Sequence, residues 1–150
     1  MATEPTIDYD RSVLGKEVPG ETITINREKI LAYAAAIGET NPLFLDDEAA
    51  VQAGYKALMA PPSYINALIL SSGRPDPKVN FGSLSFHSGQ AIETYLPIYA
   101  EDAISTTSSL EEVYAKTGRS GTMVFIVWKT ELFNQDGALV AIARESFVRR

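Results

Sequence analysis

The spacing of apolar residues divides the chain into an N-terminal part with a helical pattern and a C-terminal part with a strand pattern. Between Ile30 and Ile37, apolar residues recur at intervals of about 3.6, which predicts a helix. Asn26 can cap its first turn, and Gly38 is suited to end it. The first element predicted is therefore a helix bounded by Asn26 and Gly38.

Two shorter helices are predicted next. The first begins at Asp46 or Asp47, either of which can cap it, and ends at Gly54. The second begins at the two prolines 61–62, where a missing N–H is tolerated, and ends near residues 71–73. Its apolar stripe consists of Ile65, Leu68 and Ile69. Because alanine and leucine surround this stripe, we expect the helix to be buried on most sides.

Beyond residues 74–77 the pattern changes to alternation with β-branched and aromatic residues, which predicts strands. The strand signals lie around residues 84–86, 92–94, 104–106, 123–133 and 138–148. Residues 134–137 (NQDG) separate the last two runs, and Gly137 can take the positive φ of a bulged hairpin.

This order of elements predicts an α+β fold in which a long antiparallel sheet wraps around a central buried helix. The chain has 150 residues and no repeat or linker-like segment, so we expect one domain spanning residues 1–150. Such a sheet leaves an edge strand exposed. Pairing with a second copy or with a related chain would protect that edge, and we therefore expect a dimer.

Composition excludes several classes of function. The chain has no cysteine and one histidine, so disulfides, thiolate metal sites and a zinc centre of several imidazoles are ruled out, and we expect no metal. A net charge of −6 argues against nucleic acid as a partner. Residues 1–10 lack a signal-peptide core, and no run approaches the ~20 apolar residues of a membrane span. We expect a soluble cytoplasmic protein.

Several segments carry a resemblance to a known family. Residues 38–44 (GETNPLF) with the helix that follows, 60–64 (APPSY), 86–90 (FHSGQ) and 116–125 (KTGRSGTMVF) occur in a familiar order and spacing. Together they resemble the MaoC-like hydratase/dehydratase family, N-terminal (FAS1-like) dehydratase subtype, over nearly the whole chain. The resemblance implies the hot-dog fold. It also implies reversible addition of water to a 2-enoyl thioester of coenzyme A or acyl carrier protein, giving the (3R)-hydroxy product without a cofactor.

Three positions depart from the pattern of the catalytic family members. Glu39 stands where they carry aspartate, and its extra methylene displaces the carboxylate by roughly an ångström. Phe44 stands at the histidine position and has no titratable group. Pro62 stands where a glycine N–H would bind the thioester oxygen, and proline has no N–H. The hydration reaction needs a proton-transfer pair and such donors, so the resemblance implies a chain that lacks working catalytic groups.

Three functional hypotheses follow. The chain is the acyl-pocket subunit of a (3R)-specific enoyl-thioester hydratase, paired with a hot-dog subunit that supplies aspartate, histidine and the glycine N–H. Alternatively, it is a self-sufficient homodimeric hydratase that uses Glu39 and His87. The third possibility is an acyl-thioester binding or regulatory module that catalyses nothing.

The candidate catalytic residues are Glu39 and His87, each with a structural alternative. Glu39 can instead accept backbone N–H bonds in the turn before Pro42, and His87 can form a hydrogen bond at an interface. The predicted substrate-binding residues are Asn41, Phe44, Pro62, Ser63, Tyr64 and Arg119. Asn41 also fits a turn, Tyr64 also fits the core, and Arg119 is either a contact for the carrier's phosphates or a solvated surface residue.

Overall fold

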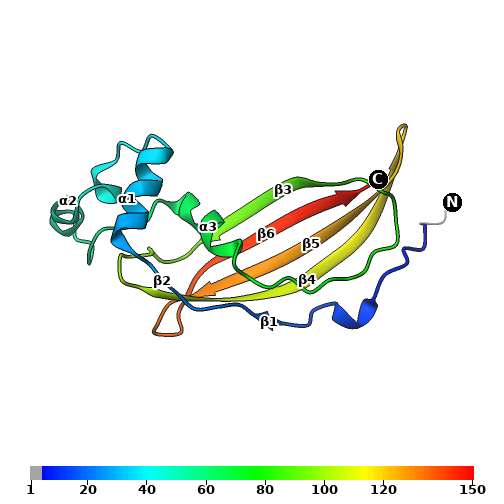
Figure 1. Cartoon of the computed structure of the whole chain (residues 1–150), viewed down its shortest axis with the longest axis horizontal. Helices are drawn as coiled ribbons and strands as arrows, with labels where there is room; N and C mark the ends of the chain where they lie inside the picture. The colour runs from blue at the N-terminus through cyan, green and yellow to red at the C-terminus, as the bar shows by residue number, and fades with distance from the viewer. Residues whose placement is uncertain (1–4) are drawn as a thin grey trace.

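The computed structural model describes residues 5–150, so the first four residues of the predicted domain lie outside it. The helices gather at one end of a long sheet, while the β4–β5 turn and the C-terminus lie at the other end (Figure 1). The helices are α1 (Arg27–Ala36), α2 (Asp47–Gln52) and α3 (Ile65–Ile69), with 3₁₀ turns η1 (Arg11–Val13), η2 (Pro42–Phe44) and η3 (Pro62–Tyr64). The strands are β1 (Val18–Pro19), β2 (Ile23–Thr24), β3 (Ser85–Thr94), β4 (Ala103–Gly118), β5 (Gly121–Phe133) and β6 (Leu139–Arg149).

The first two helices begin and end where their sequence signals predict. Asn26 Oδ1 accepts the backbone N–H groups of the next turn at 2.8 and 3.2 Å, and Gly38 follows the end of α1 with φ of +68°. Asp46 caps α2 in the same way, and Gly54 follows it with φ of +93°. Both predicted helices are confirmed. Their ends could be predicted because a capping side chain and a left-handed glycine act without help from distant residues.

The third helix is shorter and more exposed than predicted. It ends at Ile69, and the hydroxyls of Ser71 and Ser72 donate to the carbonyls of the last two helical residues, at 2.8 and 2.7 Å. Its apolar stripe is buried, but Ala67 and Leu70 on the opposite side are exposed, Leu70 by 80%. The prediction of burial on most sides was therefore wrong for this chain, since the sheet covers only one side of the helix.

The sheet is antiparallel throughout, in the order β1-β4-β5-β6-β3, with β2 also paired to β4. The predicted strand runs merge into the four long strands β3 to β6, and the hairpin prediction is confirmed: Gly137 has φ of +74°, and the register shifts between Leu132 and Phe133. The strands β1 and β2 were missed because two residues are too few to show a period. Strand β3 forms one edge of the sheet and is exposed along most of its length.

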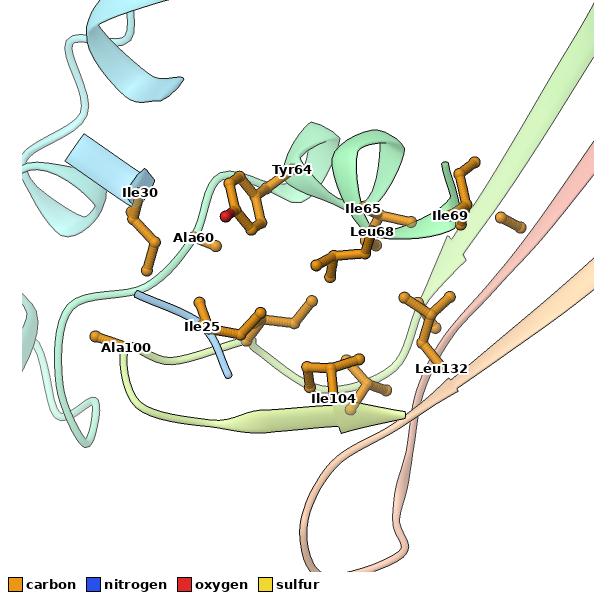
Figure 2. Packing of buried hydrophobic residues seen from close by; sticks show 14 of the residues in the cluster. Ile25, Ile30, Ala60, Tyr64, Ile65, Leu68, Ile69, Ala100, Ile104 and Leu132 are labelled. Carbon is orange, nitrogen blue, oxygen red and sulfur yellow. The ribbon is translucent and has the colours of Figure 1, made fainter. Parts of the chain in front are cut away.

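Two apolar clusters hold the fold together. The larger one joins α1, η3 and α3 to the ends of the long strands, as Figure 2 shows for Ile30, Ile65 and Leu132. The smaller one lies around Leu110, Val124 and Ile126, beneath the segment that connects α3 to β3.

This connecting segment, residues 73–84, continues from α3 along the sheet. Arg74 pairs with the buried Glu145 at 2.5 Å, and its guanidinium lies 5.2 Å from the ring centroid of Phe147. The indole N–H of Trp128 donates to the carbonyl of Pro75 at 2.9 Å. These contacts fasten the segment to β5 and β6, and so place the start of the edge strand β3.

Candidate functional site

A cavity of about 270 Å³ opens between the helical end of the molecule and the end of β3. Its walls are Phe44, Tyr55, residues 59–62, Ile65 and residues 94–98. Backbone hydrogen bonds hold two of these walls together, because the N–H of Ala60 donates to the carbonyl of Ile98 at 2.8 Å. The cavity is thus built from segments far apart in the sequence.

The chemistry of the cavity is largely apolar. No carboxylate, imidazole or amine belongs to its walls, and the titratable groups there are the hydroxyls of Tyr55 and Tyr95. The Tyr95 hydroxyl donates to Glu93 Oε2 at 2.8 Å, and this hydrogen bond raises the pKa of Tyr95. Pro61 and Pro62 contribute no N–H donor. The walls can therefore surround an apolar group, but they offer no acid or base that works near neutral pH.

Glu39 and Asn41 both stabilise the turn that leads to Phe44. Glu39 Oε1 accepts the backbone N–H groups of Thr40 and Asn41, both at 2.9 Å. Asn41 Oδ1 in turn accepts the N–H of Leu43 at 3.1 Å and caps η2. Neither side chain lines the cavity. This geometry matches the turn interpretation of both residues, and it leaves Phe44 as the residue of this segment that reaches the cavity.

His87 lies on the exposed edge strand, well away from the cavity of its own chain. It pairs in register with Phe147, and the two rings meet edge to face with centroids 5.1 Å apart. Strand β3 runs from His87 to the cavity wall at Thr94, a distance of about 20 Å at the rise of a β-strand. A single chain therefore does not bring His87 together with Glu39 in this cavity.

Ser63 and Tyr64 belong to the packing beside the cavity. Tyr64 is 6% exposed, and its ring stands edge to face against Tyr33 at 5.2 Å. Burial raises the pKa of the Tyr64 hydroxyl. The Tyr33 hydroxyl donates to Ser63 Oγ at 2.9 Å, which ties α1 to η3. Tyr64 thus occupies the core, one of the two positions open to it from the sequence.

Arg119 lies in the turn between β4 and β5, at the end of the sheet opposite the cavity (Figure 1). Of the eight predicted site residues, the structure brings Phe44 and Pro62 into the cavity. Sequence reasoning missed Tyr55 and the wall formed by residues 94–98. The sequence offered no chemical group in residues 94–98 that distinguished a cavity wall from an ordinary strand end.

Within residues 5–150, no group of three or more His, Asp or Glu side chains is placed to hold a metal ion. None of the helices in this range has the length and apolarity needed to cross a membrane.

Comparison with known proteins places this geometry in a family context. The family described as "FAS1-like, dehydratase domain region" matches residues 12–143. A UPF0336 protein from Saccharopolyspora erythraea is 31% identical over 148 residues, covering 94% of this chain and 91% of the relative. A UPF0336 protein from Parafrankia sp. is 35% identical over 130 residues, covering 84% of this chain and 83% of the relative.

Three solved structures have a similar fold. The HadBC (3R-hydroxyacyl-ACP dehydratase) complex of Mycobacterium tuberculosis matches with a TM-score of 0.73 and 20% identity, over 93% of this chain and 98% of that chain. The ChsH1–ChsH2 complex of the same organism matches with a TM-score of 0.73 and 22% identity, over 87% and 88%. The R-hydratase PhaJ1 of Pseudomonas aeruginosa matches with a TM-score of 0.68 and 20% identity, over 89% and 79%.

Proposed function

Because the chain belongs to the family of FAS1-like dehydratase domain regions and has the hot-dog fold, we propose that it is the acyl-pocket subunit of a (3R)-specific 2-enoyl-thioester hydratase. In this proposal, the chain surrounds part of the acyl thioester, and a second hot-dog subunit supplies the aspartate, the histidine and the glycine N–H of the reaction. The reaction uses no cofactor, and the thioester of coenzyme A or acyl carrier protein is the substrate. In this proposal the reaction belongs to fatty-acid metabolism in the cytoplasm.

The observation that carries the proposal is a cavity without proton-transfer groups. Hydration of an enoyl thioester requires a base to activate water, an acid to protonate the α-carbon and donors for the charge on the thioester oxygen. Phe44 and Pro62 occupy the wall where the family resemblance implies a histidine and a donor N–H. The cavity keeps the apolar surface that an acyl chain needs, while the chemistry must come from elsewhere.

The edge of the sheet supports pairing with a second subunit. Strand β3 is ten residues long and contains no proline. It pairs with β6 on one side, and no other strand of residues 5–150 pairs with its other side. Exposed apolar side chains lie at the start of β3, with Leu84 at 63% and Phe86 at 49% exposure, and directly after α3, with Leu70 at 80%. An unpaired strand of this kind is a template for another strand. Pairing through β3 would also cover the exposed side of α3.

The test is a hydration assay of the chain alone, of a dyad-containing hot-dog subunit encoded in the same genome, and of the two co-expressed. We expect negligible hydration of crotonyl thioester by the chain alone and activity in the co-purified complex. Leu84→Glu and Leu70→Asp, introduced at the proposed interface, should release the partner and abolish the added activity. A chain that forms the complex without raising its activity, or that is fully active alone, would contradict the proposal.

A second candidate, the self-sufficient homodimer, is favoured by one feature of the edge strand. If two copies pair antiparallel through β3, the start of one strand lies opposite the end of the other, so His87 of one copy approaches the cavity end of its partner. Substitutions His87→Ala and Glu39→Gln in the purified chain test this candidate. Loss of a robust activity in both variants would support it and displace the subunit proposal. Binding of acyl thioesters without turnover, with no partner recovered, would instead indicate a binding module.

A further inference from the structure

A network of charged side chains crosses the face of the sheet opposite α3 and ends at the cavity. Arg144 of β6 is its centre. Its Nε donates to both carboxylate oxygens of Glu111 of β4, at 3.1 and 2.9 Å, and its Nη1 donates to Glu93 Oε1 of β3 at 3.0 Å. The other oxygen of Glu93 accepts the hydroxyl of Tyr95 at 2.8 Å, and Tyr95 belongs to the cavity wall. We call these four residues the Tyr95 network.

Strand alternation and one bulge assemble the Tyr95 network. Ile92 and Ala143 pack in the larger apolar cluster. The residues that follow them, Glu93 and Arg144, therefore point to the opposite face of the sheet. Glu111 occupies a β-bulge, where the register of β4 with β5 shifts. A bulge redirects a side chain, and here the carboxylate reaches across β5 to the guanidinium on β6.

The Tyr95 network fixes the position of one proton. A tyrosine hydroxyl has a single proton to donate and lone pairs that accept. Arg144 holds the Glu93 carboxylate through a charge-assisted hydrogen bond, and the free oxygen of this carboxylate binds the Tyr95 proton. The same hydrogen bond raises the pKa of Tyr95, so the proton stays in place at neutral pH. Toward a ligand, the Tyr95 oxygen can therefore only accept a hydrogen bond.

The other hydroxyls of the cavity wall are not oriented in this way. Tyr55 and Thr94 also belong to the wall, and no hydrogen bond joins either hydroxyl to another of the residues 5–150. Each can turn its proton toward a ligand or away from it, so neither distinguishes a donor from an acceptor. Pockets that are largely apolar obtain their specificity from a few polar groups with fixed positions. Tyr95 is the hydroxyl of this wall that meets that condition.

We propose that Tyr95 is a specificity-determining residue of the cavity, which accepts a hydrogen bond from the hydroxyl of a 3-hydroxyacyl thioester, and that Glu93 and Arg144 are positioning residues that act through it. The inference rests on the proposed hydratase function, in which this hydroxyl distinguishes the hydrated from the dehydrated form. An enoyl or saturated acyl chain has no donor, so it would cover the Tyr95 oxygen and leave it without a partner. A chain without proton-transfer groups in its cavity would still select between the two forms.

The test is calorimetric titration of the full chain with (3R)-3-hydroxyoctanoyl-coenzyme A and with octanoyl-coenzyme A. We expect the hydroxy form to bind about fivefold more tightly, the effect of one net hydrogen bond. Tyr95→Phe should abolish this preference. Arg144→Met should reduce it to no more than about twofold, and Arg144→Lys should restore most of it, because lysine still offers Glu93 a charged donor. Lys129→Met is the control, since Lys129 lies beside Arg144 in register but pairs with Glu131.

The preference for the hydroxy form separates recognition from stability and from turnover. A wild-type chain that lacks the preference or binds neither thioester would overturn the role of Tyr95, as would a preference that survives Tyr95→Phe. Lower stability of Arg144→Met with an unchanged preference would show that the ion pairs only hold the strands together. Normal hydration by the complex without any preference refutes the role of Tyr95 alone, whereas the preference without hydration refutes only the hydratase function.

Discussion

The ion pair between Arg74 and Glu145 offers a sharp test of how the connecting segment 73–84 is held on the sheet. Glu145 is 8% exposed, and its carboxylate pairs with Arg74 alone among the described residues. Arg74 has 28% of its side chain exposed and also lies against the ring of Phe147. The two partners therefore have different alternatives when the pair is broken. Arg74 can reach water, whereas Glu145 stays buried.

This difference in burial between Arg74 and Glu145 determines how much each substitution should lower the free energy of unfolding. Removing one partner of a fully buried pair costs about 3–5 kcal/mol, because a charge is left unpaired in the interior. Partial exposure of Arg74 lets water screen the pair, so we expect Arg74→Met to lower the free energy of unfolding by about 2–3 kcal/mol. Glu145→Gln, which leaves Arg74 free to turn toward solvent, should cost about 1 kcal/mol. The double variant Arg74→Met with Glu145→Met should recover most of the loss, since no buried charge remains.

Urea unfolding followed by tryptophan fluorescence measures these differences. Trp128 is the single tryptophan of the chain and donates to the carbonyl of Pro75, next to the substituted residue. It therefore reports directly on the connecting segment. Equal costs for Arg74→Met and Glu145→Gln, or a double variant as unstable as Arg74→Met, would refute the reasoning that buried charge dominates at this site.

Three further outcomes are expected. In urea titrations, Gly82→Ala should lower the free energy of unfolding by more than about 2 kcal/mol, because Gly82 has φ of +61° and a Cβ would lie 2.3 Å from the backbone of Arg150. Gly89→Ala is the control, since Gly89 has open space around it, and it should change this free energy by less than about 0.5 kcal/mol. Burial raises the pKa of Tyr64, so the tyrosine of the unfolded chain loses its proton first, and the free energy of unfolding should fall as the pH rises above about 10. Denaturation curves measured across that pH range should show a smaller fall for Tyr64→Phe. Phe44→Ala should open the cavity and, at about 0.8 kcal/mol for each buried methylene, strengthen the binding of acyl thioesters two carbons longer by roughly tenfold in titrations. An unchanged chain-length preference would show that Phe44 is not part of the acyl pocket.

Much of the chemistry of the candidate site follows from the residue types alone. The replacement of a titratable ring by Phe44 and of an N–H by Pro62 is a property of those residue types in any conformation. The turn roles of Glu39 and Asn41 were also among the interpretations of the sequence, because a side chain bonding to a backbone group one or two residues away depends on little else. The catalytic and substrate-binding roles of these residues stay predictions.

The sequence alone determined the local features: the capped helices, the glycine turns, the hairpin at Gly137 and the division into a helical and a strand region. These depend on contacts between residues close together in the chain. Only the tertiary structure decided that α3 is covered on one side, and that residues 59–62 and 94–98 form one cavity. Such relations are set by strand register and long-range packing, in which residues with weak individual patterns are placed by partners dozens of positions away.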